Sequence, residues 1–165
     1  MIAAAPSQEE SDDFETWVAA RGPALTRYAY LVCGDVSESQ DLVQAALEKA
    51  WPRWRSISRQ GDPEAYLRRA ITNGAISRWR KLRRLRVVSQ PPLEAVHESP
   101  DSDVAWQLCA ELPARQRAAV VLRFYEDLTY ADIGKVLGCP EATARSHVHR
   151  ALTTLRGRLS PGDVR

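Results

Sequence analysis

A three-residue turn, Gly138-Cys139-Pro140, lies between two stretches whose apolar residues recur at helical spacing. Glycine ends a helix cheaply in the left-handed conformation, and proline suits the first turn of the next helix because it lacks only an N–H that would be unpaired there. The pattern therefore predicts a helix from about residue 128, a turn, and a second helix from Glu141. The residues expected to face inward are Leu128, Ala131, Ile133, Val136 and Leu137 before the turn, and Ala142, Val148 and Leu152 after it.

The second of these helices gathers basic and polar side chains beside its apolar residues. Such a helix fits the major groove of DNA, where arginine, serine and histidine reach base edges or phosphates. We therefore interpret residues 128–150 as a helix-turn-helix that binds DNA. A short helical hairpin inside an unrelated protein is the alternative that the turn alone does not exclude. The side chains in question are Arg145, Ser146, His147, His149 and Arg150.

Helical spacing continues through most of the chain, and no segment shows the sustained alternation of a strand, so the expected fold class is all-α. Gly22 and Pro23 are expected to interrupt the first helical stretch. The expected helices are 14–18, a second that begins at Pro23, a third capped by Ser37, a fourth from an Asp62 cap to about Arg84, a fifth over Val104–Glu111, and a sixth from Pro113 to about Tyr125.

The net charge of +2 divides into blocks of −3 for residues 1–60, +6 for 61–90, −5 for 91–113 and +4 for 114–165. Residues 87–103 hold three prolines and four acidic residues but no basic one, a composition typical of a linker. We expect two small helical domains with separate basic surfaces for a polyanion. The predicted organisation is a disordered lead-in at 1–9, domains at 10–86 and 104–160, and an acidic, flexible linker at 87–103.

One basic block lies on the long fourth helix, where residues 66–86 hold eight of the 23 lysines and arginines. Basic charge along one helix attracts phosphates. A solvated charged face, a membrane-surface helix and an acidic protein partner are competing interpretations. A second basic helix on a separate domain favours nucleic acid, because two linked domains can bind one duplex at two sites. The side chains expected on the buried face of this helix are Leu67, Ala70, Ile71, Ala75 and Trp79.

The sequence does not support a disulfide framework, a metal site, an enzyme active site or a membrane span. Three widely spaced cysteines, Cys33, Cys109 and Cys139, suit neither a disulfide framework nor a zinc site. His147 and His149 are two residues apart and do not share a helix face. The chain has no glycine-rich phosphate loop and no HExxH motif, so we expect no enzyme activity and no cofactor. Without an apolar run of ~18 residues or a secretory signal, a cytoplasmic protein is expected.

Four stretches together resemble the bacterial extracytoplasmic-function (group IV) sigma factors of RNA polymerase, in the sigma-70 family. GPALTRYAYLVCGDVSESQDLVQAALEKAW and DPEAYLRRAITNGAISRWRKLRR are similar to the start and the promoter-melting end of sigma domain 2. ELPARQRAAVVLRFYEDLTYADIGKVLGC and PEATARSHVHRALTTLR are similar to the first half and the recognition helix of sigma domain 4. The resemblance covers the chain from about Phe14 to Leu159. It implies an alternative sigma factor that directs core RNA polymerase to promoter DNA.

The resemblance also implies partners and roles. An anti-sigma factor would control the protein, which would be a monomer when free or in that complex. Leu122–Tyr125 would meet the polymerase flap, and the acidic linker would thread through the active-site cleft and RNA exit path. The implied site residues are Asp41, Gln44 and Arg53 for polymerase binding, Asn73, Ser77, Arg78, Arg80, Lys81 and Arg84 for the −10 element, and Thr143, Arg145, Ser146, His147, His149 and Arg150 for the −35 element.

Three positions depart from the family pattern. Ser77 stands where an aspartate is frequent, His147 where a basic residue is usual, and Ala144 where valine is usual; these changes bear on base preference rather than on the fold. If the pKa of His147 rose toward neutrality, its contribution to binding would vary with pH. The second hypothesis is a stand-alone helix-turn-helix regulator, which would bind duplex DNA tightly by itself, usually as a dimer. No sensor domain or dimerisation helix is evident in the sequence.

Overall fold

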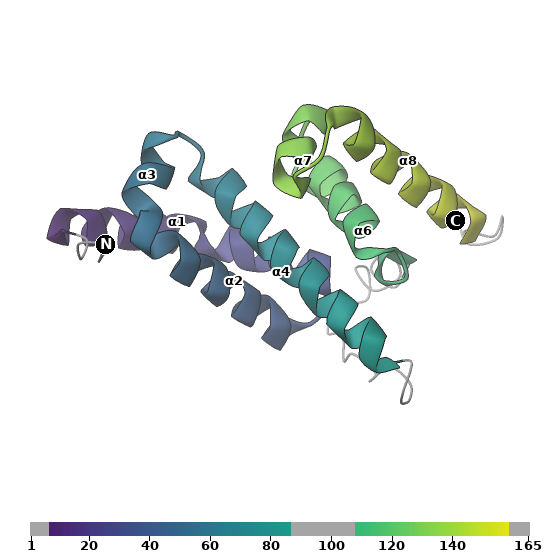
Figure 1. Ribbon diagram of the computed structural model, residues 1–165, viewed down its shortest axis with the longest axis horizontal. Helices are drawn as coiled ribbons and strands as arrows, with labels where there is room; N and C mark the ends of the chain where they lie inside the picture. The colour runs from purple at the N-terminus through teal and green to yellow at the C-terminus, as the bar shows by residue number, and fades with distance from the viewer. Residues whose placement is uncertain (1–6, 87–107, 159–165) are drawn as a thin grey trace.

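The computed structural model describes residues 7–86 and 108–158, and the regular elements in both ranges are helical, which confirms the all-α class (Figure 1). The first range forms an N-terminal bundle of α1 (Gln8–Cys33), α2 (Val36–Ala50), η1 (Trp51–Arg53), α3 (Trp54–Arg59) and α4 (Pro63–Arg86). The second range forms a C-terminal bundle of α6 (Ala114–Val120), η2 (Val121–Tyr125), α7 (Tyr130–Leu137) and α8 (Glu141–Arg158). The predicted linker at 87–103 lies outside the described residues.

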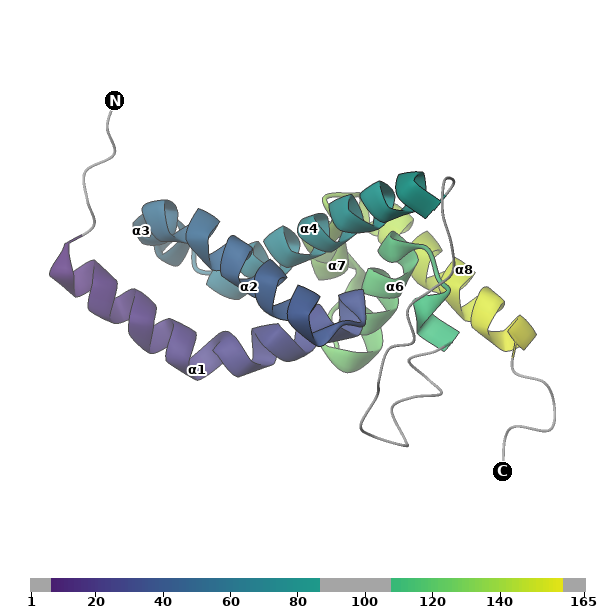
Figure 2. The same cartoon turned by 90° about the horizontal axis from the view of Figure 1, so that it is seen from below.

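The first helix is continuous, so the predicted interruption at Pro23 is wrong. Its start is fixed by a capping box, in which the Ser7 hydroxyl accepts from the Glu10 N–H and the Glu10 carboxylate accepts from the Ser7 N–H. Residues 8 and 9, predicted to be part of a disordered lead-in, are therefore helical. Pro23 removes one backbone donor without ending the helix, and the Thr26 hydroxyl donates to the carbonyl four residues earlier at 3.0 Å. Figure 2 shows α1 bending part-way along its length, as an internal proline favours.

The segment between α1 and α4 also differs from its prediction. Asp35 rather than Ser37 caps α2, because its carboxylate accepts from the Glu38 N–H at 2.7 Å. A 3₁₀ turn containing Pro52 follows α2, and the short helix α3 comes directly after it. No helix is predicted from the sequence where α3 lies.

An aromatic cluster holds α3 against the first half of α1. The ring of Trp54 packs against Phe14 and Trp17, with centroids 4.9 and 5.3 Å apart, and its indole N–H donates to the Asp13 carboxylate at 3.0 Å. Phe14 also contacts Trp51 at 4.9 Å. Aromatic pairs in tilted and edge-on arrangements stabilise by about 0.5–1.5 kcal/mol beyond their buried area.

The long fourth helix begins as predicted, because the Asp62 carboxylate accepts from the Ala65 N–H at 2.9 Å. Its apolar face packs on α1 and α2. In that core the hydroxyls of Tyr28 and Thr72 share a hydrogen bond of 2.6 Å, and both residues are fully buried. Desolvation raises the pKa of Tyr28, so its hydroxyl stays protonated. The buried residues of this core include Leu25, Ala29, Val32, Leu42, Ala46, Leu67, Ile71 and Ala75.

The C-terminal bundle contains the predicted helix-turn-helix. Thr129 caps α7 by accepting from the Asp132 N–H at 3.2 Å, and Gly138 ends that helix with φ of 65°. In α8 the inward position is Ala144, which is fully buried, whereas Ala142, predicted to face inward, is exposed. The other two predicted positions are confirmed, with Val148 buried and Leu152 half-buried, whereas Ala151 is fully buried and was not predicted.

The helix before the helix-turn-helix changes character at its end. The α-helical turns of α6 give way to a π-helical turn, in which the Glu126 N–H donates to the carbonyl of Val121 at 3.1 Å. Such a turn inserts one extra residue and rotates the side chains that follow. Asp127 then adopts φ of 53°, in the left-handed region.

The two bundles pack directly against each other, with α7 lying along α4 (Figures 1 and 2). Buried residues of both bundles, including Leu67 and Ile71 of α4 and Ile133 and Val136 of α7, form one hydrophobic cluster.

Candidate nucleic-acid interface

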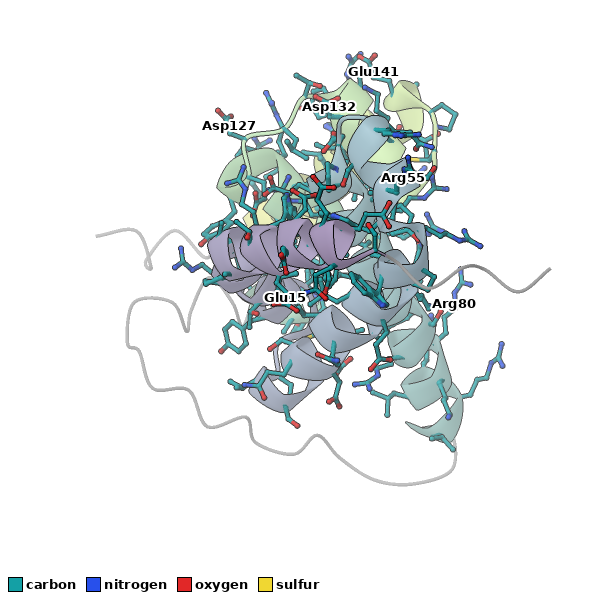
Figure 3. The ribbon with its side chains drawn as sticks, turned by 90° about the vertical axis from the view of Figure 1, so that its left-hand side faces the viewer. Glu15, Arg55, Arg80, Asp127, Asp132 and Glu141 are labelled. Atoms are coloured by element: carbon teal, nitrogen blue, oxygen red, sulfur yellow. The ribbon has the colours of Figure 1, made fainter. Side chains whose placement is uncertain are left out.

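The face of α8 opposite its core residues carries the side chains predicted to meet the −35 element. The helix is held in place by packing of its buried residues against α7. Glu141, at the start of this helix, lies at the outer end of the C-terminal bundle in the view of Figure 3. The exposed members of the predicted set are Thr143, Arg145, Ser146, His149 and Arg150, and His147 is half-buried.

Arg145 is positioned by two neighbours although its side chain is exposed. One guanidinium nitrogen lies 2.9 Å from the Glu141 carboxylate, one helical turn earlier, and the guanidinium stacks 5.0 Å above the Tyr130 ring of α7. These contacts restrict the rotamers of a long side chain before any ligand arrives. A preorganised arginine loses less side-chain entropy when it binds a base or phosphate.

The pKa of His147 does not rise toward neutrality, the condition for a pH-dependent contribution to binding. Partial burial, and then the positive charges of Arg115 and Arg150, lower its pKa from the ordinary value. The imidazole is therefore neutral at pH 7. It can donate or accept one hydrogen bond at each ring nitrogen but adds no fixed positive charge to the surface.

On α4 the predicted −10 residues separate into two groups. Asn73, Ser77, Arg80 and Arg84 are spaced four, three and four residues apart, so they follow one face of the helix, and all are exposed. Lys81 lies at the edge of that face. Figure 3 shows Arg80 at the outer edge of α4.

Arg78 points away from this face, toward α2. Its guanidinium lies 3.6 Å from the Asp41 carboxylate and 4.0 Å from that of Glu38. The structure thus brings a residue predicted to bind DNA together with one predicted to bind polymerase. Both side chains remain partly exposed, so this is a weak surface pair.

The three predicted polymerase residues lie on two consecutive elements. Asp41 and Gln44 are exposed on neighbouring turns of α2, and Gln44 donates to Glu48 at 3.3 Å. Arg53 lies beyond the end of α2, in η1. Of the predicted flap-binding residues, Leu122 is fully buried, whereas Phe124 and Tyr125 are 61% and 48% exposed.

A pocket beside α3 was not predicted from the sequence, because the helix α3 itself was not predicted. The pocket has a volume of about 740 Å³ and is lined by three arginines and an aromatic ring, a composition suited to a nucleobase with its phosphate. Arg55 also pairs with Glu10 at 3.4 Å. The lining residues are Pro52, Arg53, Arg55, Ser56, Ile57, Arg59, Gln60 and Tyr66.

The described part of the chain offers few features for other classes of site. Within residues 7–86 and 108–158, no group of three or more histidine, cysteine, aspartate or glutamate side chains is arranged to hold a metal ion. None of the helices in these ranges is long and apolar enough to cross a membrane.

Comparison with known proteins gives two family matches, one on each bundle. Sigma-70 region 2 matches residues 17–85, and Sigma-70 region 4 matches residues 103–155. The RNA polymerase sigma-E factor of Streptomyces coelicolor is 34% identical over 161 residues, covering 92% of this chain and 89% of that protein. The chain belongs to the sigma-70 family. A second relative in this family, the ECF RNA polymerase sigma factor SigW of Bacillus subtilis, is 26% identical, with coverage of 91% and 90%.

A solved sigma-70 family structure shares the fold of both bundles. It is the sigma factor RpoE in complex with the anti-sigma factor NepR from Bartonella quintana, which is 28% identical, with a TM-score of 0.75 over 89% of this chain and 96% of that one. The region 2 match begins inside α1 and ends in the last turn of α4, and the region 4 match ends inside α8. The basic face of α4 and the polar face of α8 therefore lie one in each sigma-70 region.

Proposed function

We propose that this protein is an alternative sigma factor of the extracytoplasmic-function group, which binds core RNA polymerase and directs it to specific promoters. The observation that carries the proposal is the pair of exposed basic helix faces, one in each sigma-70 region. The protein supplies no catalytic group of its own, because the polymerase performs the reaction. It acts in the cytoplasm, with its polymerase.

The α8 face binds the −35 element in the major groove. Arg145, held by Glu141 and Tyr130, is the best placed to read a base, because its guanidinium is already oriented. Arg150, His149 and the neutral side chains of Thr143, Ser146 and His147 complete this surface.

The face of α4 that holds Asn73, Ser77, Arg80 and Arg84 binds the −10 element. The arginines and Lys81 hold phosphates, and Asn73 contacts an exposed base. The arginine-lined pocket beside α3 receives a base flipped out of the non-template strand. Flipping costs a few kcal/mol of stacking, which aromatic contact with Tyr66 and phosphate contacts to Arg53 or Arg59 offset.

The exposed residues Asp41 and Gln44 on α2 bind the polymerase largest subunit, and Phe124 and Tyr125 meet its flap. Arg53 serves the DNA pocket rather than the α2 patch. An anti-sigma factor controls the protein by covering polymerase-binding surfaces, a role supported by the complex formed by the related Bartonella sigma factor.

Run-off transcription with sigma-free core RNA polymerase, on fragments of the source genome, tests the proposal. We expect specific transcripts only when both components are present. Tight duplex binding by the protein alone, without any response from core polymerase, would instead identify a stand-alone regulator.

A further inference from the structure

Glu141 is an acidic residue beside a surface proposed to bind DNA. It is the first residue of α8, and its side chain is 54% exposed. The side chains assigned to the proposed −35 surface carry no negative charge, and Glu141 is not among them. A carboxylate at this point lowers the affinity for any DNA, because phosphates repel it, unless it contacts a hydrogen-bond donor on a base.

The beginning of α8 is the part of the helix-turn-helix that is placed to reach base edges. In this motif the N-terminal residues of the second helix contact the bases in the major groove. The helix starts directly after the turn, since the N–H groups of Thr143 and Ala144 both donate to the Pro140 carbonyl at 3.0 Å. Glu141 lies in this first turn, at the outer end of the C-terminal bundle (Figure 3). Its carboxylate is therefore near the bases when α8 occupies the groove.

The carboxylate is held in one orientation through Arg145. It accepts from the Arg145 guanidinium at 2.9 Å, and that guanidinium also stacks 5.0 Å from the Tyr130 ring. The same ring lies 4.9 Å from the Arg123 guanidinium, which donates to the Leu128 carbonyl at 2.9 Å. The position of the carboxylate is thus set by contacts that extend back to α7 and the residues before it.

The Glu141–Arg145 pair keeps hydrogen-bonding capacity on both side chains. A guanidinium has about five N–H donors and a carboxylate about four acceptor positions, and their mutual hydrogen bond uses one of each. The two bonded atoms are 2.9 Å apart, close to the rise of about 3.4 Å between successive base pairs. The remaining atoms of the pair can therefore contact two neighbouring base pairs, with the guanidinium suited to O6 and N7 of a guanine.

The chemistry of a carboxylate selects one base in the major groove. Cytosine presents its N4 amino donor without an acceptor on the same base edge. Adenine presents an amino group next to the acceptor N7, whereas guanine and thymine present acceptors that repel a carboxylate. A cytosine is therefore the best partner for the acidic member of the pair.

We propose that Glu141 is a specificity-determining residue, whose carboxylate accepts a hydrogen bond from the N4 amino group of a cytosine next to the base pair that Arg145 contacts. This inference rests on the proposed function of α8 and deepens it, since it names the base that Glu141 selects. Both side chains are more than half exposed, so the ion pair adds little to the stability of the fold. Its effect falls on the choice of DNA sequence.

The alternative role for Glu141 is structural. An acidic side chain in the first turn stabilises a helix through its interaction with the helix dipole. Loss of that interaction would lower the stability of α8 but would not change which base is preferred at a single position. Base preference is therefore the measurement that separates the two roles.

Selection from duplexes with a randomised −35 region, using the full chain bound to core RNA polymerase, tests the proposal. The variants are E141Q, E141A and the control E111Q. Glutamine keeps the size of glutamate but carries an amide, which pairs with N6 and N7 of adenine. The control is matched because Glu111 forms a carboxylate–arginine pair with Arg158, at the other end of α8. Circular dichroism checks that each variant keeps its helices.

We expect wild type and E111Q to enrich a cytosine at one position by at least about fivefold over the other bases. E141Q should move the preference at that position to adenine, and E141A should abolish it. Both variants should bind unselected duplex DNA more tightly than E111Q does, because they lose a charge that the phosphates repel. Enrichment of the same base at every position by wild type and both Glu141 variants overturns the proposal.

Repeating the selection with the chain alone, at low salt, separates this proposal from the sigma function. If core polymerase does not bind but the chain alone enriches the cytosine through Glu141, the base contact stands and the sigma function fails. If the polymerase complex initiates at the selected promoters but E141Q keeps the wild-type preference, the sigma function stands and the base contact fails. Enrichment of no sequence by either preparation overturns both.

Discussion

Gly134 occupies the point where α7 comes closest to the turn that follows it. A Cβ at this position would lie 2.6 Å from the carbonyl oxygen of Cys139, which is backbone and cannot rotate away. We expect Gly134→Ala to destabilise the C-terminal bundle by about 1–3 kcal/mol, the usual cost of overpacking a tight core. Urea unfolding followed by circular dichroism measures the change.

Gly157 provides the matched control for this substitution. It is exposed near the end of α8, and an added Cβ would meet nothing within 4 Å. Gly157→Ala should leave the stability unchanged or raise it by up to about 1 kcal/mol, because alanine favours the helix. A gain in Gly134→Ala equal to that in Gly157→Ala would show that helix propensity, rather than contact with the turn, decides the effect at residue 134.

His147 gives a pH dependence whose sign follows from its lowered pKa. Above about pH 7.5 the imidazole is neutral in both the folded and the unfolded chain, so it contributes nothing to the pH dependence. As the pH falls through 6.5, the unfolded chain takes up the proton first, and the free energy of unfolding decreases. The stability of wild type relative to H147Q should therefore fall between pH 7 and pH 5.5 and stay constant from pH 7.5 to 8.5.

Chemical unfolding of both proteins at several pH values measures this difference. If the stability of wild type relative to H147Q increased at low pH, the pKa of His147 would be raised rather than lowered. For the same reason, His147 should give promoter binding no pH dependence between pH 7.5 and 8.5.

At the scale of elements, two arginines of α4 differ mainly in the direction in which their side chains point. Arg80 lies on the proposed −10 face, whereas Arg78 is directed toward Asp41 and Glu38 of α2. We expect Arg80→Ala to weaken promoter binding by the holoenzyme and to reduce the slope of log affinity against log salt by about 1, as the loss of one phosphate contact would. Arg78→Ala should change that slope by much less. Titrating promoter DNA over a range of KCl concentrations compares the two variants. Equal slopes of log affinity against log salt in Arg80→Ala and Arg78→Ala would show that the two side chains do not differ in their contact with DNA.

The sequence predicted those elements whose ends carry local signals. Asp62 and Gly138 mark helix ends by their own chemistry, and both predictions are confirmed. The signal at Pro23 was misleading, because an internal proline bends a long helix that packing holds on both sides. The helix α3 was missed because it spans six residues and is stabilised by aromatic contacts with distant α1 rather than by its own periodicity.

The sequence predicted only the part of the candidate site that depends on local signals. Helical spacing was enough to place Asn73, Ser77, Arg80 and Arg84 on one face of a helix. It could not reveal that Arg78 turns toward α2, or that Arg53 lines a pocket with α3, since both depend on how separate helices pack. The contact between Arg68 and Glu126, 58 residues apart, leaves no local signal at all.

At the scale of the whole molecule, the shared apolar cluster couples the two bundles. Because Leu67 and Ile71 of α4 belong to the same buried cluster as Ile133 and Val136 of α7, unfolding one bundle exposes apolar surface of the other. We expect a single calorimetric transition for the full chain, with equal van't Hoff and calorimetric enthalpies. Two resolved transitions, or a calorimetric enthalpy well above the van't Hoff value, would show that the bundles unfold independently.

The aromatic cluster of α1 and α3 gives this chain an intrinsic fluorescence signal. Trp17, Trp51 and Trp54 lie in that cluster and Trp79 on α4, whereas residues 108–158 contain no tryptophan. Four of the five tryptophans of the chain lie in residues 7–86, the fifth being Trp106, so intrinsic fluorescence excited at the indole band reports chiefly on the N-terminal bundle, without any attached dye. Trp79, stacked 5.2 Å from the Arg83 guanidinium beside the proposed −10 face, is placed to change its emission when a nucleic acid draws that arginine away.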